Sequence, residues 1–217
     1  MGNTLDKEKT YLRLSGMIAG NLGALSPEVV DYYINHASEI PAALTRGFVV
    51  QEKFSLLLDL GIVTVPDDYV HETALAKFLE QNRKEFYDAN KNITDCNFSN
   101  PTRVLKPGDK FRVRVFRQIA DGETTSAERL NFLRQQKAVF VGAQGTTLVF
   151  NQKRDQLPKG KWYTSFDEPD RLWQDADGCH GVPYVRACSV GGFVWRLGDF
   201  EDDWSGGSCF LCFCEVE

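Results

Sequence analysis

The sequence predicts an α+β protein built from two parts, and three observations support this fold class. Residues 1–100 carry apolar residues at helical spacing. Residues 101–217 instead carry short alternating or continuous apolar runs, which are typical of strands. A polar stretch at 90–109 contains two prolines and one glycine and predicts a connector. We therefore expect a small helical N-terminal region followed by a strand-rich module.

The N-terminal part contains three candidate helices. Ser26 before Pro27 predicts a helix start, because a serine cap and a proline in the first turn both favour a helical N-terminus. Residues 49–60 form a second candidate, which Gly61 would end. A third candidate spans residues 71–90, where apolar residues recur at helical spacing. We expect these helices to anchor the module to a partner or to a second copy of the chain.

The strand-rich part begins with Phe111–Val115, whose strict alternation predicts a half-buried strand. Thr125 and Glu128 fit a capping box, so we expect a helix from there to about Gln136. Short strands separated by glycine turns should follow, over residues 138–141, 146–150 and 161–166. The segment 142–145 should be a turn rather than a phosphate-binding loop, because no Lys-Ser/Thr pair follows it.

The tail after Trp173 is dense in glycine, aspartate and aromatic residues. Phe193–Leu197 alternates, and Phe210–Cys214 is apolar on both faces, as in a central strand covered on both sides. The Trp195 side chain shares a strand face with apolar neighbours, so we interpret it as structural, and Trp204 likewise.

Charge and composition disfavour several classes of protein. The net charge is −5 and the pI is about 5.3, which disfavours nucleic-acid binding because phosphate affinity requires concentrated Lys and Arg. No apolar run is long enough to span a bilayer, and the first residues carry charges where a secretory leader would be apolar. We therefore expect a cytoplasmic protein whose six cysteines remain thiols and which does not bind membranes.

The last 95 or so residues carry a resemblance to a known family. It rests on the stretch FLRQQKAVFVGAQGTTLVFNQKRDQLPKGKWYTSFDE, followed by VPYV, GGF and the segment from Trp204 to Phe213. This combination of segments resembles the target (variable) proteins of diversity-generating retroelements. The resemblance implies a C-type-lectin-like fold, often of the formylglycine-generating-enzyme subtype. It also implies a C-terminal coding stretch that a reverse transcriptase rewrites at adenines, so that each cell lineage displays a different binding surface.

The residue types of the tail are consistent with such rewriting. Ile, Met, Thr, Asn and Lys all have codons that begin with adenine, and residues 1–164 contain 42 of them. The 53 residues from Ser165 to Glu217 contain none, although about 13 would be expected at the upstream rate. Chance depletion in a tail rich in Trp and Gly is the alternative explanation.

We therefore expect a ligand-binding protein without catalytic activity or cofactor, with a variable region at about 175–210 and a protein or other macromolecule as its ligand. Recognition surfaces favour Tyr and Trp for rigid contact area, and small polar residues for adaptable hydrogen bonds. The candidate contact residues are Asp177, Cys179, His180, Gly181, Tyr184, Arg186, Cys188, Val194, Arg196, Asp199, Asp202, Asp203, Ser205 and Ser208.

Two other interpretations of the tail stay open. A metal- or thiol-dependent enzyme could use Cys179, His180, Cys188 and Cys209, since thiolate and imidazole are zinc ligands. Core packing is the alternative for the cysteines, because free Cys is among the most buried residue types. The acidic run 199–203 could hold calcium, but one short run is more often a solvated loop, because calcium needs six to eight oxygens.

Overall fold

The computed structural model describes residues 38 and 52–216, with residue 190 excepted. The chain divides into two compact units, residues 1–51 and 52–217, and the following description concerns the second. The expected helix start at Ser26 lies outside the described residues. The expected boundary near residue 100 falls inside the second unit, so the structural division at Glu52 replaces it. The physical reason is that residues 54–89 supply two strands and a helix to the same body as the tail.

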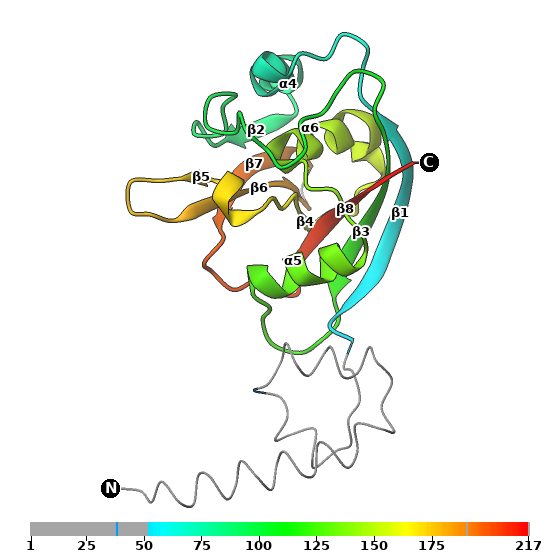
Figure 1. The fold of residues 1–217 in the computed structure, drawn as a ribbon, viewed down its shortest axis with the longest axis vertical. Helices are drawn as coiled ribbons and strands as arrows, with labels where there is room; N and C mark the ends of the chain where they lie inside the picture. Colours follow the sequence, from blue (N-terminus) through cyan, green and yellow to red (C-terminus); the bar gives the residue numbers. More distant parts are fainter. Residues whose placement is uncertain (1–37, 39–51, 190, 217) are drawn as a thin grey trace, which may run out of the picture. The chain divides into compact units, whose positions relative to one another are not determined.

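One mixed sheet forms the centre of this unit (Figure 1). In spatial order its strands are β1 (Phe54–Thr64), β3 (Lys110–Gln118), β8 (Ser208–Glu215), β4 (Trp162–Thr164), β6 (His180–Ala187), β7 (Phe193–Asp199) and β2 (Phe86–Ala89). The short β5 (Trp173–Gln174) pairs with β6 off this path. Two contacts are parallel, between β4 and β8 and between β2 and β7, and the other contacts are antiparallel.

The helices lie on both faces of the sheet, so the α+β class is confirmed. They are α4 (Ala74–Asn82), α5 (Ser126–Gln135) and α6 (Gly142–Lys153), with single 3₁₀ turns at His71–Thr73, Arg154–Gln156 and Pro169–Arg171. In the described part of the chain, no helix has the length and apolar character that a membrane span requires.

The central strand β8 shows how the two faces are covered. Its residues Cys209, Leu211 and Phe213 pack in one cluster with Val149 of α6. The alternate residues, which include Phe210 and Cys212, pack in a second cluster with the apolar side of α5. The prediction of a strand buried on both sides is therefore confirmed, and Cys212 is fully buried as expected of a core thiol.

Several other sequence predictions are confirmed. Both hydrogen bonds of the capping box between Thr125 and Glu128 form at the start of α5. The strands predicted around residues 111–115, 161–166 and 193–197 are β3, β4 and β7. Both tryptophans assigned to the framework are buried, with exposed fractions of 0% for Trp195 and 5% for Trp204.

Two of the helices predicted in the N-terminal part were wrong in whole or in part. The described part of the 49–60 candidate is not helical, because Phe54–Thr64 forms the edge strand β1. Its pairing with β3 is irregular at Leu57 and Leu60, and these bulges break the two-residue alternation that would have identified a strand. The third helix candidate is helical only as far as Asn82 before the chain enters β2.

The predicted turn at 142–145 and strand at 146–150 are instead the first nine residues of α6. Glycine, threonine and valine have poor helix propensity, which favoured the strand interpretation. All nine residues are buried. Tertiary packing therefore overrides local propensity, because most helical stability in proteins comes from buried contacts.

Gly145 allows α6 to approach the sheet closely. A β-carbon at this position would lie 2.5 Å from Val141 Cγ2 and 2.9 Å from Phe213 Cζ. Both distances are shorter than van der Waals contact, and both neighbours are buried in the same cluster. The absence of a side chain at residue 145 is thus a packing requirement of the interface between α6 and β8.

We predict that Gly145→Ala destabilises the protein by about 1–3 kcal/mol, because the added methyl group overpacks this interface. A loss of stability would indicate overpacking, because alanine in place of glycine normally stabilises a helix interior by about 1 kcal/mol. Urea unfolding of both proteins measures the difference. Gly206→Ala is the matched control, because a β-carbon there meets no atom within 4 Å. Equal or greater stability of Gly145→Ala would contradict the packing assignment.

Candidate functional site

One face of the sheet carries partly exposed side chains beyond the part that α5 covers. Trp162 of β4, Tyr184 and Arg186 of β6, and Arg196 of β7 share this face, because Trp162 pairs with Arg186 and Tyr184 pairs with Arg196. Asp88 of β2 lies at the end of the same row. All five side chains are exposed or half-buried. We call these five residues the open face.

Aromatic stacking makes the middle of the open face rigid. The Trp162 and Tyr184 rings lie nearly parallel, with 5.7 Å between their centroids and 17° between their planes. The Arg186 guanidinium lies 5.6 Å from the centre of the Trp162 ring. Such stacks contribute roughly 0.5–1.5 kcal/mol beyond the buried area. These side chains are thus ordered before any ligand arrives.

An ion pair fixes the second arginine of the open face. Arg196 Nε donates to Asp88 Oδ2 at 2.6 Å, and this hydrogen bond raises the pKa of the Arg196 guanidinium. Beside them, the Tyr87 hydroxyl lies 2.6 Å from Cys188 Sγ. Burial raises the pKa of the Tyr184 phenol. The Tyr184 hydroxyl therefore stays protonated at neutral pH and can donate a hydrogen bond.

Carboxylates gather at the opposite end of the same strands. We call Asp175, Asp177, Asp199, Glu201 and Asp202 the acidic tip; they lie in the turn between β5 and β6 and in the segment where β7 ends. Burial and then the neighbouring carboxylates raise the pKa of the Asp199 side chain.

His180 and Cys179 lie beside the acidic tip but show no sign of nucleophile activation. His180 Nδ1 lies 2.6 Å from Glu201 Oε1. Partial burial opposes ionisation of Glu201, but its hydrogen bonds with His180 lower the pKa overall. Desolvation and the carboxylates, with Asp175 first among them, raise the pKa of the Cys179 thiol. A reactive cysteine requires the opposite shift.

The buried side chain of Arg129 holds the loop that precedes β8. Arg129 of α5 is 0% exposed, and its guanidinium contacts the rings of Trp204 and Phe210 at 5.4 and 5.3 Å. It donates hydrogen bonds to Thr124 Oγ1, Gln118 Oε1 and the carbonyl oxygens of Ser205 and Ser208. These hydrogen bonds therefore hold the backbone of residues 205–208 in place.

The candidate contact residues divide by burial. Seven are exposed, namely Asp177, Arg186, Arg196, Asp199, Asp202, Asp203 and Ser205, and three are half-buried, namely Cys179, His180 and Tyr184. The remaining four, Gly181, Cys188, Val194 and Ser208, are buried and are corrected to framework positions.

The structure gives a reason for each correction. A β-carbon at Gly181 would lie 3.0 Å from Leu197 Cδ1, so a larger residue there would crowd its neighbours. Val194 and Cys188 are 5% and 6% exposed in the core. Ser208 is 0% exposed, and its carbonyl group is bound by Arg129. None of these side chains is available to a large ligand.

The candidate contact residues expected from the sequence do not include Trp162, Asp88 or Tyr87. Trp162 precedes the expected variable region, and only its place in an alternating strand next to the buried Tyr163 could have marked it as outward-facing. Asp88 and Tyr87 lie more than a hundred residues before Arg196 and Cys188 in the chain. Their association depends on the parallel pairing of β2 with β7, for which the sequence carries no local signal.

The residues of the enzyme alternative are not brought together. Cys179 and His180 lie at the start of β6, and Cys188 follows its end. Cys209 packs in the core cluster that contains α6, where burial raises its pKa. Among the described residues, no group of three or more His, Cys, Asp or Glu side chains is arranged to hold a metal ion. That statement covers the acidic run 199–203 as well.

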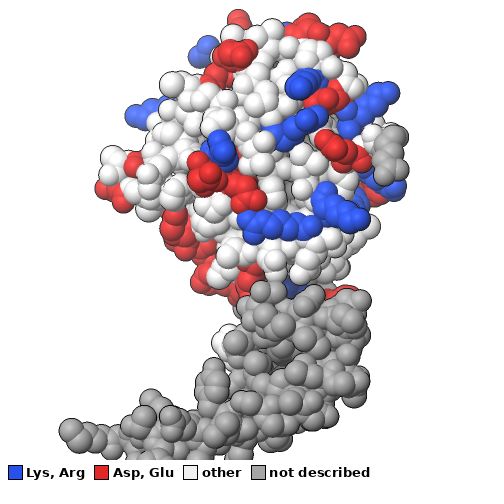
Figure 2. All heavy atoms as spheres, viewed as in Figure 1, with Lys and Arg blue, Asp and Glu red and all other residues white. Residues whose placement is uncertain are grey.

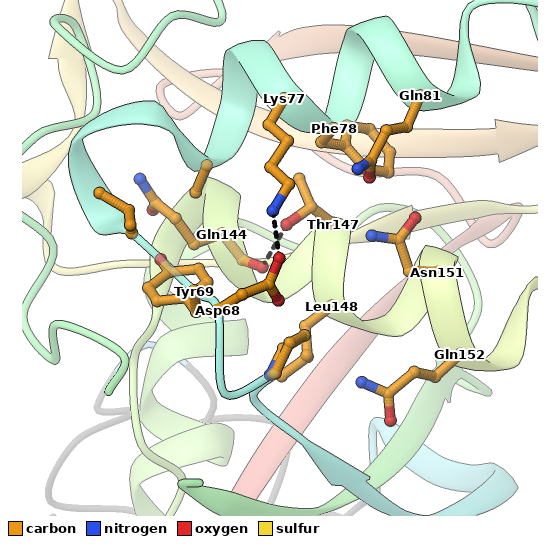
Figure 3. A pocket seen from close by; sticks show the side chains of 13 residues that line it. Asp68, Tyr69, Lys77, Phe78, Gln81, Gln144, Thr147, Leu148, Asn151 and Gln152 are labelled. Carbon is orange, nitrogen blue, oxygen red and sulfur yellow. Dashed lines mark hydrogen bonds and ion pairs between the residues drawn. The ribbon is translucent and has the colours of Figure 1, made fainter. Parts of the chain in front are cut away.

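A separate cavity of about 140 Å³ lies between α4 and α6 (Figure 3). Lys77 and Asp68 form an ion pair at its mouth, at 2.5 Å, and Gln144, Thr147 and Asn151 supply polar lining. Small-molecule sites usually measure about 300–1,000 Å³, so this cavity suits a few water molecules. A shallower hollow of about 530 Å³ lies between α4 and β2 and is bordered by Tyr87 and Asp88.

Charges of both signs are interspersed over the surface that Figure 2 shows. No broad area of that view carries Lys and Arg alone. The chain has no match among protein-family models and no significant match among curated proteins or solved structures.

We predict a fixed order of alkylation for the thiols. Iodoacetamide at neutral pH should label the exposed Cys96 first, Cys179 more slowly, and Cys209 and Cys212 last. Burial raises the pKa of Cys212 to about 12, and only the thiolate reacts, so its labelling should be at least about a hundredfold slower. Peptide mapping by mass spectrometry gives the order.

Labelling in concentrated urea is the control, because all six thiols should then react at similar rates. If Cys179 in the native protein reacts faster than Cys96, the thiol beside His180 is activated, and the enzyme alternative gains support.

Proposed function

We propose that this chain is a cytoplasmic ligand-binding protein that displays a diversified recognition surface on a C-type-lectin-like scaffold. The main support for the proposal is that a boundary in residue composition coincides with the end of a strand. The segment without Ile, Met, Thr, Asn or Lys starts at Ser165, directly after β4 ends at Thr164. It therefore contains the whole β6–β7 hairpin and the loop before β8, which supply three residues of the open face and most of the acidic tip.

The scaffold suits this role because its core depends little on the exposed tail side chains. The two helices between β3 and β4 cover the centre of the sheet on both faces. The last strand, β8, returns to pair with β3, which brings the two ends of the module together. This closed arrangement, with two helices between paired end strands, supports the lectin-like assignment. Rigid scaffolds tolerate sequence change in the segments that they display.

The geometry favours a macromolecular ligand over a small molecule. The open face is an array of side chains on a sheet, and the cavity between α4 and α6 is small. Exposed Arg, Trp and Tyr side chains are the residue types that dominate protein–protein contacts. A protein or another large molecule can contact the open face and the neighbouring loops together.

The DNA around the gene tests diversification. We expect a near-repeat of the last hundred or so coding nucleotides that differs from them only at adenines, beside a reverse-transcriptase gene. Sequencing the locus in several lineages should also show replacements concentrated at codons for exposed positions. Absence of any near-repeat would reject diversification.

A pair of matched variants tests the division between surface and framework. Combined serine substitution of Tyr184, Arg186 and Arg196 should cost about 1 kcal/mol of unfolding free energy, because it removes one exposed stack. Substitution of the single buried Trp195 by serine should cost about 3–5 kcal/mol. Urea unfolding measures both values. Loss of folding in the triple variant would show that the scaffold depends on the tail surface.

A further inference from the structure

The positive charges of the open face are unequally neutralised. Asp88 binds Arg196 through a 2.6 Å hydrogen bond. Arg186, in contrast, contacts the Trp162 ring and has no ion-pair partner in the described part of the chain. Its guanidinium therefore keeps donors available on the exposed side of the stack. A charged ligand would meet one uncompensated positive charge next to a rigid aromatic surface.

Neutral donors lie beside this charge. Tyr184 is the cross-strand partner of Arg196 and stacks on Trp162. Within the residues described, its hydroxyl makes no hydrogen bond. Arg186 and Tyr184 are two positions apart on β6, so both side chains point to the same face. A guanidinium and a phenol hydroxyl that converge on one face suit a carboxylate, which accepts several hydrogen bonds.

We infer that the open face binds an acidic peptide segment of a partner protein, with one carboxylate on Arg186 and an apolar or aromatic neighbour against Trp162 and Tyr184. This inference rests on the proposed binding function and names the chemical class of its ligand. The stack supplies contact area that is already ordered, and Arg186 supplies the charge-assisted hydrogen bonds.

The acidic tip favours a peptide over a nucleic acid. Arg186 lies six positions after His180 on β6, which is about 20 Å of extended strand. Beyond His180 lie the exposed carboxylates of Asp177, Asp199 and Asp202. A continuous polyanion that followed the strand would meet these charges, whereas a peptide with a local acidic group would not. The chain's net charge of −5 also disfavours a nucleic-acid ligand.

Two residues outside the tail act as positioning residues for this contact. Trp162 precedes the proposed variable segment and holds Arg186 by stacking. Asp88 lies in β2 and holds Arg196. Removal of the Asp88 charge should free Arg196 to share the ligand carboxylate. Substitution at Asp88 should therefore strengthen binding, which a merely structural role would not do.

The experiment titrates the full-length protein with two twelve-residue peptides that share their aromatic residues and differ only in carrying glutamate or lysine. A single-stranded oligonucleotide is the third probe. The readout is the indole N–H resonance of Trp162, assigned with Trp162→Phe. We expect saturable shifts with the glutamate peptide alone, and weakening at high salt. Arg186→Ala should weaken binding about fivefold, and Asp88→Asn should strengthen it about twofold.

Arg112→Ala is the matched control, because Arg112 is an exposed arginine that pairs with Asp59 on β1. Its binding should equal that of the unmodified chain. An equal or stronger response to the lysine peptide or the oligonucleotide would overturn the inference. So would a response to the glutamate peptide that Arg186→Ala leaves unchanged, or the absence of any shift.

These outcomes are distinguishable from failure of the proposed function. If the adenine-specific near-repeat exists and the glutamate peptide does not bind, the ligand class is wrong while diversification stands. If the peptide binds through Arg186 and no near-repeat exists, the acidic-peptide site stands on a surface that is not diversified.

Discussion

The structure depends on one buried side chain, the guanidinium of Arg129, because it connects α5 with the end of β3 and with the loop before β8. It reaches from α5 to Gln118 at the end of β3, to the carbonyl oxygen of Ser205 in the loop before β8, and to that of Ser208 at the start of β8. A buried charge is costly unless its hydrogen bonds are satisfied, and four oxygens and two rings surround it. Burial lowers its pKa to about 10, so it remains charged at neutral pH. The loop therefore has little freedom, although its surface residues are small and polar.

The packing of β8 explains how a stable core lies beneath an exposed surface. Cys209, Leu211 and Phe213 of β8 face α6, and the alternate residues face α5, so core contacts on both faces fix the strand. From β8 outward, the sheet continues into β4, β6 and β7, where one face remains covered and the other opens. Side chains on the open side add contact area without carrying the core. On β6 and β7 the open face thus carries exposed side chains, whereas Val185 and Trp195 on the other face pack in the core.

The side chains that make the open face rigid come from strands in different parts of the chain. Trp162 stacks against Tyr184, and Asp88 binds Arg196, so residues from β4 and β2 order residues of the hairpin. Ordering before binding reduces the entropy that association must overcome. The acidic tip at the other end of the hairpin has no comparable stack. Burial and then the neighbouring carboxylates raise the pKa of the Asp199 side chain there, so this carboxyl group lies among like charges.

The sequence by itself determined the elements whose signals are local. The capping box of α5 satisfies its own backbone groups, and the alternation of β3 and the double-sided apolar run of β8 reflect burial directly. Tertiary structure alone decided α6, because burial stabilises a helix of poor propensity, and β1, because its bulges hide the alternation. It also decided the membership of the open face: exposed tail residues such as Arg186 could be predicted, whereas Asp88 joins them through strand pairing across more than a hundred residues. Such pairing depends on the energy of the whole sheet, and no short segment encodes it.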